Sequence, residues 1–323
     1  MDVMLDVCQG FLEKHPQRAC GRELSAGTHI FLSVLGLWFH GSTAMQTLLM
    51  SHPNISTLCA SESWQCEGDK LLRNSSDPEA KRGWNIKWYD YAFNHVDNTP
   101  PPFLSRNYTA MLKTFAEVWD LRQPVLMTKM WHPGIASYIN GIARAPMPGA
   151  MLRGGVQRLV PAYLLLWTPL CMRQYAHGSL MSGVNRSVLN WRDEVRGLME
   201  LKQTHLALNR YGASTLVISY ADLLWYPEST LQRLGCFLPC LRPFPASSLN
   251  FVPRSGVDFN PKSRFKIHGT IRSYGDAHPP RGYGYDLTFG RCTQGWGSAI
   301  PELSGAQQQA IVSDLHAYFA NHS

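Results

Sequence analysis

Four short runs of apolar residues, rich in β-branched and aromatic side chains, predict buried strands. They cover residues 29–35, 123–130, 162–167 and 213–220. Stretches in which apolar residues recur every three or four positions lie between and after these runs and predict helices. The helices are expected at 44–52, 170–182, 188–210, 227–235 and 304–320. Apolar strands that alternate with helices are typical of an α/β fold with a parallel sheet covered on both faces.

The domain organisation follows from the length of the chain and from the places where this alternation stops. We expect an N-terminal extension over residues 1–28 and a single domain over 29–320. Residues 64–123 predict a mixture of helices and loops, whereas 144–156 and 243–300 predict loops because glycine and proline are frequent there. No apolar run reaches the roughly 18 residues of a membrane span, so no integral membrane segment is expected.

Composition and charge narrow the function classes only slightly. The chain has 323 residues, of which 45% are hydrophobic and 16% charged, which suits a packed core and excludes disorder. The net charge of +7 favours anionic partners such as phosphates. The basic residues are scattered rather than gathered into a run, so a nucleic-acid partner is not expected.

The signals for the cellular compartment conflict. The eight cysteines form no CxxC pair, and no cluster of histidines lies near them in the sequence. No metal site is therefore expected. Five N-x-S/T sequons favour a secretory lumen and a glycoprotein; they begin at Asn54, Asn74, Asn107, Asn185 and Asn321. The first 28 residues lack the apolar segment of a signal peptide. Two compartments stay open: the cytoplasm, or the Golgi lumen with a membrane anchor outside this sequence.

The turn after the first predicted strand carries the best candidate chemistry. Residues 36–43, GLWFHGST, have the outline of a phosphate-binding loop in which Ser42 stands where the lysine belongs. Gly41 lets the backbone curl, and the N–H groups at the start of the following helix can then face an anion. An ordinary strand-to-helix turn has the same appearance. In kinases and ATPases the lysine of this loop neutralises the phosphate that is transferred. Since this chain has a serine there, a kinase or ATPase is disfavoured.

Five segments resemble, in order, the motifs of the sulfotransferase family. They are GLWFHGSTAMQTLLMSHPNI, PVLMTKMWHP, VPAYLLLWTPLCMRQYAHGS, LVISYADLLWYPESTLQRLGCFL and GRCTQGWGSAIPELSGAQQQAIVSDL. The resemblance runs from about residue 29 to residue 318, with residues 60–120 and 243–285 unassigned. The resemblance implies a P-loop-containing, sulfotransferase-like α/β fold. It also implies transfer of a sulfuryl group from 3′-phosphoadenosine 5′-phosphosulfate (PAPS) to a hydroxyl, without a metal.

The resemblance also implies which residues bind the donor. The family's phosphosulfate loop falls on Phe39, His40, Gly41, Ser42, Thr43 and Ala44. Its 3′-phosphate and adenine segments fall on Trp167, Tyr175 and Tyr220, and its closing stretch contributes Arg281 and Arg291. The acceptor is expected to be a small molecule or a glycan, and the variable segments that would select it leave its identity open, as they do the oligomeric state.

Three residues are candidates for the catalytic steps. Lys129, at the end of the second strand, falls on a family lysine and can stabilise the charge on the leaving phosphate. Either His132 or Glu62 is the candidate base that takes the acceptor's proton. A solvated or structural role is the plain alternative for each of them.

The sequence departs from the family at the residues that hold the donor. Phe39 stands in place of a basic residue, Trp167 in place of an arginine and Tyr175 in place of a serine. His40 and Arg173, as well as the two arginines of the closing region, are candidates to replace the lost charge. The alternative function is therefore a catalytically impaired sulfotransferase-fold protein that serves as a binding module.

Overall fold

The fold is given by a computed structural model. It describes residues 26–36, 42–58, 67–81, 107–129, 141–142, 144–167, 191–210, 212–238 and 305–322. Within these ranges a five-stranded sheet has the order β2-β3-β1-β4-β5, with every neighbouring pair parallel. The strands are β1 (Thr28–Gly36), β2 (Ile55–Ser56), β3 (Val125–Lys129), β4 (Arg158–Trp167) and β5 (Ser214–Ser219).

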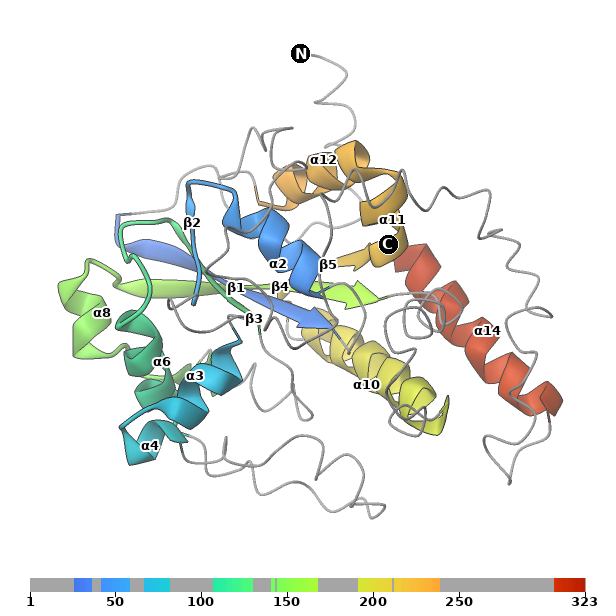
Figure 1. Cartoon of the computed structure of the whole chain (residues 1–323), viewed down its shortest axis with the longest axis horizontal. Helices are drawn as coiled ribbons and strands as arrows, with labels where there is room; N and C mark the ends of the chain where they lie inside the picture. Colours follow the sequence, from blue (N-terminus) through green and yellow to red (C-terminus); the bar gives the residue numbers. More distant parts are fainter. Residues whose placement is uncertain are drawn as a thin grey trace, which may run out of the picture.

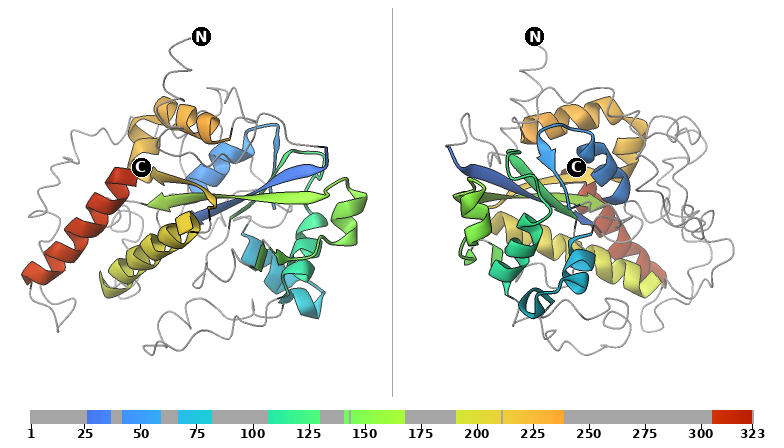
Figure 2. Two further views of the ribbon diagram at one scale, coloured as in Figure 1. Left: turned by 180° about the vertical axis from the view of Figure 1, so that it is seen from behind. Right: turned by 60° about the vertical axis from the view of Figure 1, so that its left-hand side comes forward.

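The helices form a layer on each side of the sheet (Figure 1). One side carries α2 (Ser42–Met50), α11 (Tyr220–Trp225) and α12 (Pro227–Phe237). The opposite side carries α3 (Gly68–Asn74), α4 (Pro78–Lys81), α6 (Tyr108–Ala116), α8 (Gly149–Arg153), α10 (Trp191–Arg210) and α14 (Gly305–His322). Figure 2 shows the sheet between these two layers from behind and from the side. None of the helices in the described ranges combines the length and apolarity that a membrane crossing needs.

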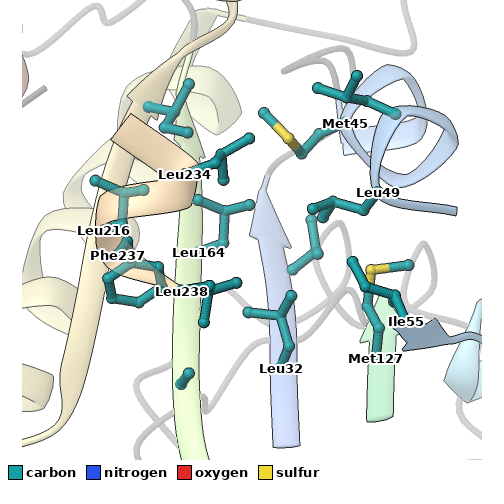
Figure 3. Packing of buried hydrophobic residues seen from close by; sticks show 14 of the residues in the cluster. Leu32, Met45, Leu49, Ile55, Met127, Leu164, Leu216, Leu234, Phe237 and Leu238 are labelled. Atoms are coloured by element: carbon teal, nitrogen blue, oxygen red, sulfur yellow. The ribbon is translucent and has the colours of Figure 1, made fainter. Parts of the chain in front are cut away.

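Side-chain alternation along the strands divides the core between the two faces. On β4, Ala162, Leu164 and Leu166 face α2 and α12, whereas Tyr163, Leu165 and Trp167 face α10 and α14. Figure 3 shows Met45 and Leu49 of α2 over β1 and β3. It also shows Leu234 and Phe237 of α12, with Leu238 directly after the helix, over β4 and β5. The four longer strands β1, β3, β4 and β5 are thus buried on both faces over most of their length, which explains why their sequences are mostly apolar.

The second face has two separate apolar clusters. Near the amino end of β1, Phe31 packs edge-on against Trp119, with ring centroids 5.8 Å apart, within the cluster that α6 and α8 complete. Near the carboxyl end, Leu35 belongs to the cluster built by α10 and α14. Ser33 lies between Phe31 and Leu35 on the same face of the strand, so a polar residue separates the two clusters.

The predicted α/β class and the four predicted strands are confirmed. The helices expected at 44–52, 188–210, 227–235 and 304–320 are present within a few residues of those bounds. The loop prediction for 144–156 was wrong over Gly149–Arg153, which form α8 and bury Met151. Gly155, with φ of 89°, lies just after this helix. The helix expected at 170–182 and the loop expected at 243–300 lie outside the described residues.

Candidate functional site

The parallel strands bring their carboxyl ends to one edge of the sheet, where ligands bind in open α/β folds. This edge carries Gly36 of β1, Lys129 of β3, Trp167 of β4 and Tyr220, which directly follows β5. The chain leaves β1 toward β2 and β3 on one side, and β4 and β5 lie on the other side. The topological switch point therefore lies beside the end of β1, at the turn that the sequence singles out.

The two ends of that turn lie close together. Gly36 pairs with Leu166 of β4, and a Cβ atom on Gly36 would lie 3.3 Å from Leu166 Cβ and 3.6 Å from Ser42 Cβ. Ser42 begins α2 and is buried. The first turn of α2 is thus held against the ends of two strands, with its amino end toward the switch point. Such a helix end offers unpaired backbone N–H groups and a positive dipole to an anion.

The residues that end α2 have a structural role. His52 is buried, and its Nδ1 accepts a hydrogen bond of 3.1 Å from the backbone N–H of Asn54. The backbone N–H of Val125 in turn donates to the carbonyl of Asn54 at 3.2 Å, which joins this turn to β3. The His-Pro pair of the first motif therefore fixes the return of the chain from α2 into the sheet.

Lys129 lies at the carboxyl end of β3 as expected, and it has an acidic partner. Its ammonium Nζ lies 3.2 Å from Oε1 of Glu67, and the lysine side chain is only 2% exposed. Glu67 precedes α3 and forms an isolated parallel bridge with Lys129. The positive charge of Lys129 is therefore balanced inside the protein by the carboxylate of Glu67, whose side chain is 13% exposed.

Trp167 ends β4 on the face that α14 covers. Its ring stacks on Phe319 with centroids 5.4 Å apart and an interplanar angle of 23°, and it lies 5.8 Å from the ring of His316. The side chain is 4% exposed and belongs to the apolar cluster of α10 and α14. The observed packing is that of a core residue, on the face opposite α2.

Tyr220 opens α11 and is half-buried against the core beneath α12. Close by, Asp222 and Arg233 link α11 to α12. The Arg233 guanidinium lies 3.7 Å from the Asp222 carboxylate and donates a 2.8 Å hydrogen bond to the carbonyl of Val217 on β5. Burial raises the pKa of Asp222, and the neighbouring Arg233 only partly offsets this. Arg233 therefore joins α12 both to α11, through Asp222, and to β5, through the carbonyl of Val217.

The other predicted site residues lie beyond what the structure describes. His132, Glu62, Phe39, His40, Gly41, Tyr175, Arg281 and Arg291 are outside the described residues. Thr43 and Ala44 lie in the first turn of α2, where only the backbone is described. Of the predicted set, the described part of the chain thus brings Ser42, Lys129, Trp167 and Tyr220 to the same sheet edge, with Trp167 turned toward α14. Their roles in binding or catalysis stay predictions.

Glu67 is the residue that the sequence reasoning missed. It comes 62 positions before Lys129, and no motif links the two. One signal was available: a lysine in an otherwise apolar strand needs an acidic partner when it is buried. No group of three or more metal-ligating side chains occurs among the described residues.

Comparison with known proteins adds little to this geometry. The chain matches no family model and no curated protein. Among solved structures it is similar to the sulfotransferase domain from the curacin biosynthetic pathway, at 15% identity and a TM-score of 0.41. The match covers 89% of this chain and 98% of that chain.

Proposed function

We propose that the protein is a sulfotransferase that moves a sulfuryl group from PAPS to a hydroxyl of a glycan or another alcohol. The observation that carries this proposal is the turn between β1 and α2. Its sequence resembles the family's phosphosulfate loop, and its ends, Gly36 and Ser42, lie together at the topological switch point. Four further family-like segments follow in the expected order along the chain.

The reaction assigns three tasks to the protein. The acceptor oxygen attacks the sulfur, the bond between sulfur and the 5′-phosphate oxygen breaks, and 3′-phosphoadenosine 5′-phosphate (PAP) leaves with the electron pair. The acceptor's proton goes to a base, for which His132 and Glu62 are the candidates. The start of α2, with the Ser42 hydroxyl, is suited to hold the phosphate on which negative charge grows.

Lys129 is the proposed cation for the leaving phosphate, and its pairing with Glu67 sets how it acts. A lysine held by a carboxylate 3.2 Å away is fixed in position but partly neutralised. We propose that Glu67 positions the ammonium at the sheet edge and that the ammonium moves toward the phosphate when the donor binds. Glu67 is then a positioning residue, whose loss changes turnover more than donor affinity.

The second candidate function is a binding module without catalysis. Two observations favour it. Trp167, at the position of the family's phosphate-binding arginine, is packed against Phe319 in the core. Lys129 is already balanced by an internal carboxylate. A protein that keeps the fold but lacks a grip on the 3′-phosphate would recognise a glycan or another protein rather than PAPS.

A transfer assay tests the proposal. The full chain is incubated with PAPS labelled with ³⁵S in the sulfuryl group and with a panel of glycans, phenols and simple alcohols. Label transferred to one class of acceptor, and lost in Lys129→Ala but retained in Lys113→Ala, supports the enzyme. Lys113 is an exposed lysine paired with Asp77 at 3.4 Å, and it serves as a control for the removal of a paired lysine away from the sheet edge. No transfer to any acceptor, together with no hydrolysis of PAPS, favours the binding module.

A further inference from the structure

We propose that Asn74 carries an N-linked glycan, in a chain that folds in an oxidising secretory compartment, whereas Asn54 and Asn107 stay unmodified. This inference concerns a modification site and does not depend on the transferase activity. Four of the five sequon asparagines are described, and the structure separates three whole sequons by how their side chains are used.

Asn74 is the open sequon. It is the last residue of α3, and both Asn74 and Ser76, the hydroxyl residue of the sequon, are exposed. The Asn74 side-chain amide makes no hydrogen bond to the residues that the structure describes. Ser75 between them leaves the helix in an extended conformation, with φ of −58° and ψ of 144°. An exposed asparagine with an exposed hydroxyl residue two positions later can carry a glycan without disturbing the packing.

Asn54 lies in the turn between α2 and β2 and is integrated into the sheet. It is half-buried, and its backbone N–H and carbonyl bond to His52 and Val125. The hydroxyl residue of this sequon, Ser56, is buried in β2, and its Oγ accepts a 2.7 Å hydrogen bond from the backbone N–H of Asp120. A glycan on Asn54 would oppose the closure of this edge of the sheet.

Asn107 is used as a helix cap. Its Oδ1 accepts a 3.0 Å hydrogen bond from the backbone N–H of Ala110 at the start of α6. Its Nδ2, the atom that would carry a sugar, donates to Oε2 of Glu79 at 3.4 Å. Both ends of the Asn107 amide therefore have partners, unlike those of Asn74. The Asn185 sequon and Ser323 of the Asn321 sequon lie outside the described residues.

Cys236 indicates an oxidising compartment. Its side chain is buried in α12 at 1% exposure and is part of a disulfide. The partner cysteine lies outside the described ranges, because Cys236 is the one cysteine within them. Disulfides persist in secreted and lumenal proteins and are rare where glutathione keeps thiols reduced. The same oxidising lumen holds the machinery that glycosylates sequons, so the two features support one location.

The modification is a glycosyl transfer with a lipid-pyrophosphate-linked oligosaccharide as the donor. Nδ2 of Asn74 attacks the anomeric carbon, and the bond between that carbon and the pyrophosphate oxygen breaks. The lipid pyrophosphate leaves with the electron pair, and the amide loses one proton. The product is an N-glycosidic bond, and no oxidant or reductant is involved.

The glycan would lie away from the candidate site. Helix α3 starts beside Glu67, which contacts Lys129, and Asn74 is at its other end, next to α4 (Figure 1). Seven residues of helix separate the two points by roughly 10 Å. The test for the glycan on Asn74 can therefore fail without contradicting the proposed transferase activity, and the reverse also holds.

The test is glycopeptide mapping of the full chain purified from the cells that make it naturally. Release of glycans by a peptide:N-glycosidase in ¹⁸O-water converts an occupied asparagine to labelled aspartate. We expect the label at Asn74 and none at Asn54 or Asn107. We also expect Cys236, in the protein unfolded with denaturant, to react with iodoacetamide only after reduction. An unlabelled Asn74 overturns the proposal, as does a reduced Cys236, and label at Asn54 or Asn107 overturns the selectivity.

Variants of the sequons test the same assignment in a second, independent way. The chain is directed into the endoplasmic reticulum of a eukaryotic host by an added leader, and its glycoforms are separated by gel electrophoresis. Asn74→Gln and Ser76→Ala should each remove one glycan step, whereas Asn107→Gln should leave the pattern unchanged. Ser76→Ala keeps the asparagine, which separates loss of the sequon from loss of Asn74 itself. Glycosidase-sensitive steps that persist unchanged in both Asn74→Gln and Ser76→Ala overturn the assignment.

Discussion

Lys129 and Glu67 form an ion pair at the carboxyl end of β3, with 3.2 Å between Nζ and Oε1 and side chains only 2% and 13% exposed. Removing one partner of a buried pair leaves the other charge without compensation. Glu67→Gln should therefore lower the free energy of unfolding by about 3–5 kcal/mol, measured by urea denaturation.

Two further variants test this reading of the pair. The double variant Glu67→Gln/Lys129→Met should recover most of the loss, since it removes both charges. Lys113→Met breaks the more exposed pair with Asp77 and should cost no more than about 1 kcal/mol. Equal effects of Glu67→Gln and Lys113→Met would contradict a buried pair at the site.

Trp167 is expected to act through packing rather than through contact with the donor. Trp167→Ala should cost about 3–5 kcal/mol, because it leaves a cavity against Phe319. Trp167→Phe keeps a stacked ring and should lose less stability, and it should change PAP affinity by less than about twofold. If Trp167→Phe lost PAP affinity while stability stayed high, the indole N–H of Trp167 would be a contact to the donor, at the position of the family's arginine.

Tyr163 carries a buried hydroxyl without a hydrogen-bond partner in the described part of the chain. It lies in register with Ser33, whose hydroxyl is likewise unpaired, and burial raises the pKa of Tyr163. An unsatisfied buried hydroxyl costs about 1–3 kcal/mol, so Tyr163→Phe should stabilise the protein by about 1 kcal/mol or more in urea denaturation. Destabilisation instead would reveal a bound water or another partner at this position.

His316 should make the protein sensitive to acid. Burial lowers the pKa of this histidine from 6.5 to about 4. Between these values the unfolded chain binds a proton that the folded protein does not, so stability falls as the pH drops from 6.5 toward 4. The full effect is roughly 3 kcal/mol.

His316→Gln removes the titrating group and should make stability depend less on pH between 4 and 6.5. The comparison is the denaturation midpoint of the two proteins at several pH values between 4 and 7. Parallel curves for the two proteins would contradict the assignment, because the slope would then arise from other groups.

The sequence predicts the main strands of the sheet well, because these strands are buried. Strands β1, β3, β4 and β5 are covered on both faces, so each appears in the sequence as a mostly apolar run. Elements with weaker signals were missed. Helix α8 has only five residues, follows a proline and begins with a glycine. Strand β2 has only two residues, and α11 starts directly at the end of β5 without a turn residue between them.

The candidate site is less predictable from sequence, because its chemistry depends on contacts between distant residues. A motif places Lys129 at a strand end but does not predict that Glu67 neutralises it. Likewise, alignment with a family arginine says nothing of the side to which Trp167 points. That direction follows from the alternation along β4 and from the helix that covers its face.

The most direct test of the central claim is binding of PAP by isothermal titration calorimetry, with ADP as the control and at two salt concentrations. PAP and ADP each carry two phosphates, but PAP has the second one on the 3′ oxygen and ADP has it on the 5′-phosphate. A preference for PAP therefore reports a site that recognises the 3′-phosphate. A sulfotransferase should bind PAP with a dissociation constant on the order of micromolar, more weakly at high salt, and should bind ADP far less well. Absence of heat with PAP at both salt concentrations would contradict the proposed function and leave the binding module as the role of this fold.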